Sequence, residues 1–329
     1  MTMTSMMTMT SRAALVATVL AAAGSARADA PVSLPDGVFE RAQVDVGPSR
    51  KAIATVTVDN PLGDVRVEGH DGKNVQILAI KRAPDDDTLD RLRVSLVPDP
   101  DGAVRIVTAV DGGREAKPVP RSAVRIDLVI RAPRDAKVDA RVRGGKLELV
   151  NMDAGGELDA GDGPIAVENV SGAVFARSLA GPQHFKTVFG TIDALAITAD
   201  LDLDTVRGDA LVASVHAGHI EGRRVSSKKV ELRTTRGDIT LDATPVAGGE
   251  MVIASLRGDV SVTLHGGIPV RVRASGARVT LPPGGSSIAA TAARPSEIDY
   301  GGVGAADGVA PTELELRSRF GAVRFAVVK

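Results

Sequence analysis

A short phrase that recurs along the chain restricts most strongly what this sequence can fold into. Its clearest copy, Val230–Leu241, reads V-E-L-R-T-T-R-G-D-I-T-L and has alternating apolar residues on both sides of Gly237. Such alternation predicts half-buried β-strands. Glycine supplies the positive φ that a tight bend requires. Each copy of the phrase therefore predicts two short strands that meet at a glycine.

Glycines at comparable positions mark further copies through the second half of the chain. Neighbouring glycines are often about 18 to 21 residues apart, with half-steps of about 9 to 10 at Gly172 and Gly218. Serine or threonine often stands three residues before the bend, where its hydroxyl can bond backbone groups that the turn leaves unpaired. These glycines are Gly145, Gly163, Gly190, Gly208, Gly218, Gly237, Gly258 and Gly321, and the hydroxyl residues are Thr187, Thr205, Thr234, Ser255 and Ser318.

The length of one copy determines how the copies must pack. A unit this short cannot bury its own apolar side chains, so successive copies must stack on one another. Aromatic residues make up only 2% of the chain, and tryptophan is absent. A thin stack of aliphatic rows can do without these large side chains, which dominate most globular cores. We therefore predict an all-β protein, with a right-handed parallel β-helix or β-solenoid over residues 137–329.

The first half of the chain departs from the regular spacing of the glycine bends. Residues 50–136 show strand-like alternation broken by turn signals such as Asp71-Gly72 and Asp111-Gly112-Gly113. These signals allow hairpins, so this N-terminal β segment is expected to be mixed or antiparallel. Residues 29–49 are expected to form an N-terminal tail.

Two other segments interrupt the strand pattern. Residues 282–311 are rich in glycine, alanine and proline, which predicts an excursion loop before a last rung at Leu314–Val328. Helix is expected only at Asp86–Leu92 and Gly284–Ala293.

Residues 1–28 have the pattern of a secretory signal peptide. Arg12 precedes the apolar stretch Ala13–Ala23, and Ala26-Arg27-Ala28 gives a small-x-small cleavage pattern before Asp29. The apolar stretch is too short to span a bilayer core of roughly 30 Å. We expect an exported chain that begins at Asp29 and resides in the periplasm or outside the cell. A retained membrane anchor is the alternative.

Composition narrows the classes of partner and cofactor. The net charge of −1 offers no broad basic surface for nucleic acid. The absence of cysteine excludes disulfides, thiolate metal sites and cysteine nucleophiles. We expect no cofactor and no integral membrane segment after signal cleavage. An envelope protein or a glycan is the expected partner.

The repeated phrase also carries a family resemblance. Its pattern, (S/T)-x-x-G-(D/x)-(I/V) on valine-rich strands behind a signal-like segment, resembles the bacterial β-strand-repeat family known as "putative adhesin", a domain of unknown function. The resemblance covers roughly residues 52–328 and is clearest over 185–264. It implies a β-helix-like solenoid with a binding or structural role, and it brings no catalytic residues.

The tripeptide Arg-Gly-Asp occurs three times and allows two interpretations. As an integrin-type recognition sequence it would indicate adhesion. We favour a structural origin, because a bend that needs glycine would be copied with its charged neighbours whenever a rung is duplicated. Arginine and aspartate would then pair across turns, each pair contributing about 0–1 kcal/mol. The copies are Arg207-Gly208-Asp209, Arg236-Gly237-Asp238 and Arg257-Gly258-Asp259.

Two further groups are candidate surface sites. His216 and His219 flank one bend and could begin a zinc site, although no third ligand stands at a usual spacing. Asp200, Asp202 and Asp204 alternate along one strand, about 6.5–7 Å apart, and could line a cation or glycan groove. We favour solvated side chains for both groups, and we expect no metal site.

A glycan-active enzyme on a β-helix, of the lyase or hydrolase type, is the alternative functional class. Such enzymes use paired carboxylates and often aromatic platforms beneath the sugar. This chain has one tyrosine and no tryptophan, and it contains no G-x-S-x-G nucleophile elbow. We therefore predict a non-enzymatic structural or adhesin-like interaction module of the cell envelope.

Overall fold

The structure is a computed structural model in which almost all regular structure is β-strand. It describes residues 26–28, 32–34, 37–48, 51–99, 101–112, 119–281, 286–287, 297–301 and 308–328. Within these ranges the strands are joined by one short α-helix, α1 (Asp86–Leu89), and one 3-10 turn, Arg121–Ala123. The prediction of an all-β protein is confirmed, and α1 lies inside the first predicted helix. Within the second predicted helix, only strand β24 (Ser286–Ser287) is described.

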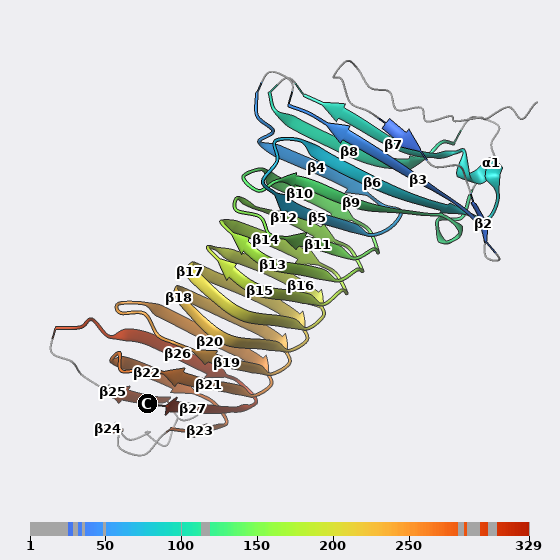
Figure 1. Cartoon of the computed structure of the whole chain (residues 1–329). Helices are drawn as coiled ribbons and strands as arrows, with labels where there is room; N and C mark the ends of the chain where they lie inside the picture. The colour runs from blue at the N-terminus through green and yellow to red at the C-terminus, as the bar shows by residue number, and fades with distance from the viewer. Residues whose placement is uncertain are drawn as a thin grey trace, which may run out of the picture.

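From β10 to β19, over residues 137–243, each strand pairs in parallel with a strand one turn further along the chain. Val138 of β10 (Lys137–Val142) lies beside Gly156 of β12 (Gly155–Ala160). Val230 lies beside Met251 of β20 (Glu250–Arg257) in the same way. The chain therefore winds as a flattened coil of two strand layers, which Figure 1 shows as successive turns from green to orange.

The two layers are named here by the order in which the chain visits them. The first layer contains β8 (Ala103–Val110), β4 (Thr55–Asn60), β10, β12, β14 (Ala173–Ser178), β16 (Ile192–Thr198), the second halves of β17 (Leu201–Ala217) and β18 (Ile220–Arg236), β20, β26 (Thr312–Ser318) and β22 (Val270–Ser275). The second layer contains β9 (Arg125–Pro133), β5 (Val65–His70), β11 (Leu147–Val150), β13 (Ile165–Ser171), β15 (Gln183–Phe189), the first halves of β17 and β18, β19 (Ile239–Ala243), β21 (Val260–His265), β27 (Ala322–Val328) and β23 (Arg278–Thr280).

The core lies between the layers as rows of aliphatic side chains. Val174, Ile192, Leu211, Val230 and Met251 are register neighbours in successive turns, and all five are buried. Alternate residues of each strand face outward, as the period of two requires. The stacked aliphatic core expected from the composition is therefore present.

Glycines line both edges of the coil. At the first corner, where the chain passes from the first to the second layer, a Cβ on Gly237 would lie 2.0 Å from the carbonyl oxygen of Gly218. At the second corner, a Cβ on Gly208 would lie 2.0 Å from the carbonyl oxygen of Gly190. The φ angles of Gly237 and Gly208 are 144° and 159°. Close backbone approach thus requires glycine at both edges.

The glycines predicted as one series therefore form two series on opposite edges. The first corner carries Gly145, Gly163, Gly218, Gly237, Gly258 and Gly321, and the second carries Gly172, Gly190 and Gly208. The single-series interpretation is wrong because both corners place the carbonyl of the preceding turn where a Cβ would lie. The half-steps in the sequence are the distance along the chain from one corner to the other.

Hydroxyl side chains bond the backbone at the first corner, as predicted. Thr234, Ser255 and Ser318 donate to the carbonyl oxygens of the preceding corner glycines, over 3.1, 3.0 and 2.7 Å. Thr187 and Thr205 precede glycines of the second corner and instead adopt positive φ angles of 55° and 59°. The same residue types thus have different backbone roles at the two edges.

The N-terminal segment is a mixed sheet that continues the coil. β6 (Val75–Ala83) pairs antiparallel with β9, and β7 (Leu92–Pro98) pairs antiparallel with β8. β4 pairs in parallel with β8 on one side and with β10 on the other. The described strands of this segment thus include both parallel and antiparallel pairs, and β4 and β5 pair directly with β10 and β11 of the following turns.

The predicted tail, residues 29–49, is wrong over the strand β3 (Gly37–Val46). β3 pairs antiparallel with β6 and buries Val38, Val44 and Val46. Nearby prolines and charged residues made the alternation of these valines hard to recognise in the sequence. Two short strands, β1 (Ala26–Ala28) and β2 (Val32–Leu34), pair with β3. The rest of the predicted signal peptide, residues 1–25, lies outside the described residues.

The predicted last rung is present but is not last in space. β26 and β27 lie between the strand pair β20 and β21 and the strand pair β22 and β23 (Figure 1). The predicted loop 282–311 is partly strand, because β25 (Glu297–Gly301) pairs antiparallel with β22. No helix of the described residues is long and apolar enough to cross a bilayer.

Candidate functional site

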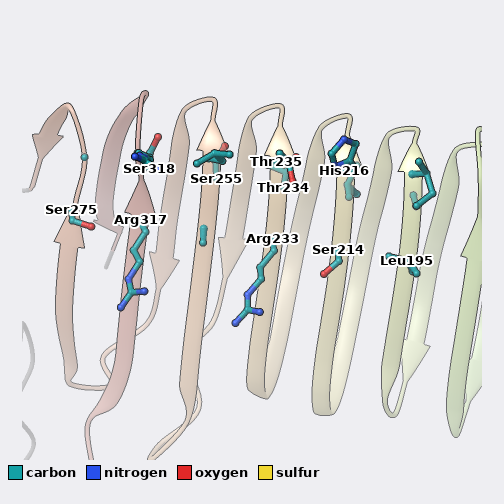
Figure 2. Close-up of a pocket in the computed structure, with 17 residues that line it drawn as sticks. Leu195, Ser214, His216, Arg233, Thr234, Thr235, Ser255, Ser275, Arg317 and Ser318 are labelled. Carbon is teal, nitrogen blue, oxygen red and sulfur yellow. The ribbon is translucent and has the colours of Figure 1, made fainter.

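A groove with a volume of about 680 Å³ runs along the outer surface of the first layer, beside the first corner. Leu195, Ser214, Arg233, Ala254 and Arg317 occupy the same register position in successive strands. Figure 2 shows Leu195, Ser214, Arg233 and Arg317 as one row across parallel ribbons. The groove is therefore built by the repeat itself, one side chain from each turn.

A second row of groove residues lies two positions nearer the corner. It contains Ile197, His216, Thr235, Leu256 and Arg319. Leu195 and Ile197 are each 41% exposed, and Leu256 is 38% exposed. Scattered exposed aliphatic residues are ordinary, but a contiguous apolar patch rimmed by polar groups marks an interaction site.

The charge of the groove is one-sided. Arg233, Arg317 and Arg319 line it, and its lining contains no aspartate or glutamate. Arg233 lies 3.0 Å from Glu231, and Arg317 pairs with Glu315. Both carboxylates stand two residues earlier on the same strand, outside the groove. The groove therefore combines exposed aliphatic side chains with three arginines, two of which pair with glutamates outside it.

One exposed aromatic ring extends this surface at the C-terminal end of the coil. Phe320 is 61% exposed and follows Arg319 at the first corner. The guanidinium carbons of Arg319 and Arg257 lie 5.3 and 5.9 Å from the centre of its ring. These distances are within the range of cation–π attraction. The contacts hold two arginines beside the groove.

Side chains just past the first corner bond the backbone of the next turn. Asp200 Oδ1 accepts from the N–H of His219 (2.8 Å), and His219 Nδ1 accepts from the N–H of Asp238 (3.1 Å). Asp238 Oδ1 then accepts from Asp259 N–H (2.7 Å), and Asp259 Oδ1 accepts from Ala322 N–H (2.8 Å). We call this series the corner ladder.

The three Arg-Gly-Asp copies do not share one surface. Arg236 and Arg257 are register neighbours at the first corner, immediately after Thr235 and Leu256 of the groove. Their aspartates, Asp238 and Asp259, belong to the corner ladder. Two of the three carboxylates thus accept hydrogen bonds from backbone N–H groups of the next turn, which agrees with the structural interpretation.

The remaining copy, Arg207-Gly208-Asp209, lies at the second corner. It is therefore not a copy of the same rung position, contrary to the duplication origin expected for all three. The expected ion pairs across turns are also wrong, because no ion pair among the described residues joins an arginine and an aspartate of these tripeptides. Asp259 instead lies 2.9 Å from Arg324.

The two candidate histidines, His216 and His219, lie in different surroundings. His216 lines the groove, whereas His219 accepts a backbone hydrogen bond in the corner ladder. No group of three or more histidine, cysteine, aspartate or glutamate residues within the described ranges could hold a metal ion. The structure therefore does not bring these histidines together.

The three alternating aspartates each have a partner of their own. Asp200 belongs to the corner ladder, and Asp202 Oδ2 lies 2.8 Å from His184 Nδ1. Asp204 pairs with Arg224. Asp202 and Asp204 lie on the second layer, on the other side of the coil from the groove. The carboxylate groove that was the alternative to solvated side chains is therefore not formed as one opening.

One prediction concerns acid and the corner ladder. The hydrogen bond from Ala322 N–H, and then the Arg324 side chain, lower the pKa of Asp259. A lowered pKa stabilises the folded chain above the unfolded value of about 3.9, and this contribution is lost as the pH falls through the folded pKa. Asp259→Asn should therefore lower the melting midpoint at pH 7, and its effect should shrink as the pH falls through the folded pKa.

The effect should be at most about 1 kcal/mol, because solvent screens an exposed pair. Thermal melts between pH 2 and pH 7 measure it, with Asp209→Asn at the second corner as the control. An equal effect of Asp259→Asn at both pH values would contradict the assignment.

Sequence reasoning missed the groove although a signal for it was present. In the stretch Ala194–Ile197 the small alanines face the core, and the larger Leu195 and Ile197 face solvent. All four residues are apolar, so hydrophobic pattern alone does not tell which pair faces inward. The usable signal was the alternation set by Ile192 and Asp193, because Leu195 and Ile197 fall on the same strand face as the charged Asp193. Residue size points the other way, since large aliphatic residues normally occupy the buried positions.

Comparison with known proteins yields only distant structural likenesses. No protein-family model matches the chain, and no curated protein matches it. A "putative adhesin" from Parabacteroides merdae is 9% identical with a TM-score of 0.47, and the match covers 88% of this chain and 96% of that chain. A "putative adhesin" from Bacteroides fragilis is 14% identical with a TM-score of 0.42, covering 88% and 97%.

A third solved structure, a "putative cell adhesion protein" from Clostridium sporogenes, is 10% identical with a TM-score of 0.23 and coverage of 88% and 100%. Two of the three share the words "putative adhesin" with the family that the sequence resembles. Likeness at this level of identity says nothing about a ligand.

Proposed function

We propose that this chain is an exported, non-enzymatic β-solenoid, of the right-handed parallel β-helix type, that serves the cell envelope as an interaction module. Parallel pairing of strands one turn apart and glycine corners on both edges support the solenoid class. The signal-like residues 1–28 support export. The groove along the first corner is the observation that carries the binding role.

The groove has the properties of a recognition surface. Its volume of about 680 Å³ lies within the range of roughly 300–1,000 Å³ that ligand sites occupy. The strands beneath it already hydrogen-bond a neighbour on both sides, so a partner must be recognised by side chains rather than by strand addition. Exposed aliphatic residues beside arginines favour a partner that carries apolar and acidic groups.

The lining also supports a non-enzymatic role over the glycan-active alternative. Glycoside hydrolysis generally needs two carboxylates that face one opening. The groove lining includes no aspartate or glutamate, and Asp200, Asp202 and Asp204 each bond a different group. Binding without turnover is therefore the function that we propose.

Charge placed on the exposed aliphatic residues of the groove should weaken binding. A pull-down from the native envelope, followed by mass spectrometry, identifies the partner, and titration then gives its affinity. Leu195→Glu combined with Leu256→Glu should weaken binding at least tenfold, or about 1.4 kcal/mol, because it buries carboxylates against an acidic partner. Both residues face solvent, so melting behaviour should be nearly unchanged.

The matched control is Phe189→Glu, which places a carboxylate on an exposed residue of the second corner. This variant should bind like the wild type. Equal binding by all three proteins would remove the groove from the proposed function. Turnover of the captured partner by the wild-type chain would favour the enzymatic alternative.

A further inference from the structure

A second hollow, of about 460 Å³, lies where the N-terminal mixed sheet meets the first turns of the coil. Four arginines from separate segments line it: Arg82 in β6, Arg121 in the 3-10 turn, Arg125 in β9 and Arg143 after β10. No aspartate or glutamate is among its lining residues. We call it the arginine pocket.

One of the four arginines is neutralised by neighbouring carboxylates. Arg125 Nη2 lies 2.6 Å from Asp64 Oδ2, and its Nε lies 2.8 Å from Asp127 Oδ1. The hydrogen bond to Asp127 is the main cause that raises the pKa of Arg125. The same carboxylates accept the backbone N–H groups of Lys146 and Asp64. Asp64 and Asp127 thus bond both Arg125 and the backbone of neighbouring turns.

The other three arginines have no such partner. No ion pair within the described residues involves Arg82, Arg121 or Arg143, and all three side chains are exposed. Acidic residues are as numerous as basic ones in the whole chain, 41 against 40. A hollow whose charged lining residues are all arginines is therefore a local excess of positive charge, which attracts anions.

Glycines keep the same hollow open. Gly63, Gly144 and Gly145 line it and bring no side chain into it. A Cβ on Gly145 would lie 2.0 Å from the carbonyl oxygen of Gly63, whereas a Cβ on Gly144 would meet nothing within 4 Å. The turns that contain Gly63 and Gly145 are therefore in tight contact, whereas the space beside Gly144 is open to a ligand.

We propose that the arginine pocket binds an acidic glycan through its carboxylate or sulfate groups. A planar guanidinium pairs with two oxygens of such a group at once. Ser122 and the glycine backbone can bond sugar hydroxyls. A membrane surface is disfavoured, because the net charge of −1 leaves no broad basic face. The proposal relies on the proposed export, which brings glycans within reach, and it is independent of the groove.

The test is calorimetric titration of the purified chain from Asp29 with oligogalacturonate. The combined variant Arg82→Gln, Arg121→Gln and Arg143→Gln should bind at least tenfold more weakly than the wild type. The single variant Arg143→Gln should show an intermediate loss, and it serves if the triple variant is less stable. Inorganic phosphate and vesicles of phosphatidylglycerol are titrated in parallel and should bind weakly or not at all.

A matched control removes the same charge elsewhere. Arg105→Gln, Arg131→Gln and Arg177→Gln change three exposed arginines outside both hollows. This control should bind like the wild type. Equal losses in the two triple variants, no binding of oligogalacturonate, or tighter binding to vesicles would each overturn the proposal. The groove variant Leu195→Glu with Leu256→Glu should keep the glycan affinity, so failure at one site is distinguishable from failure at the other.

Discussion

Gly237→Val is expected to destabilise the coil by roughly 3–5 kcal/mol, because backbone strain and overpacking each cost about 1–3 kcal/mol or more. The φ of Gly237 is 144°, a conformation that valine rarely adopts. Its Cβ would also lie 2.0 Å from the carbonyl oxygen of Gly218, so the two turns would have to separate. Thermal or urea unfolding of the mature chain measures the loss.

Gly267→Val is the matched control for this change. Gly267 also stands between two strands, but a Cβ there would meet no atom within 4 Å. Its substitution should change stability by no more than about 0.5 kcal/mol, as is usual for surface positions. If Gly237→Val melted like this control, the first corner would not be a site of close backbone contact.

Removal of residues 312–329 is expected to unfold the C-terminal end of the coil. This deletion takes β26 and β27 from between two strand pairs, so β20 and β22 both lose a partner. Four buried apolar side chains, Leu314, Leu316, Val323 and Phe325, leave with them. At about 1.5–3 kcal/mol for each side chain, the loss rivals the whole stability of a typical domain.

Hydrogen exchange of the amides in β20, β21 and β22 measures this effect. Protection there should fall sharply, while protection in β10 to β15 should stay as in the intact chain, because a stacked array unfolds locally. Deletion of residues 29–34 is the control, since it removes only β2 from the outer side of β3. Unchanged protection after loss of residues 312–329 would mean that β20 pairs directly with β22.

The sequence was informative wherever structure depends on neighbours in the chain. Alternation around Gly237 predicted the strands and the bend, and the residue types predicted the hydroxyl bonds of Ser255 and Ser318. Order in space was harder to infer. Nothing local distinguishes a corner such as Gly208 from one such as Gly237, because both serve the same close contact. The insertion of β26 depends on pairing between distant segments, which has no local signature.

The candidate sites were unpredictable for a related physical reason. A groove or pocket on a coil arises from residues that meet only through stacking, such as Leu195 and Arg317, or Arg82 and Arg143. Motif reasoning instead singled out compact groups, namely the Arg-Gly-Asp tripeptides and the alternating aspartates. Several of their carboxylates, including Asp238 and Asp259, hold one turn to the next.

The irregular strands lie at the two ends of the coil, so the number of turns between them can change in evolution without altering either end. The interior turns from β12 to β18 pair only with similar turns, whereas the mixed N-terminal sheet and the inserted β26 and β27 close the ends. Duplication of one interior turn would leave both ends unchanged and move them apart by about 4.8 Å. The arginine pocket and the groove both lie along the first corner, separated by several turns. Each duplicated turn would therefore increase the distance between the two sites by the same step.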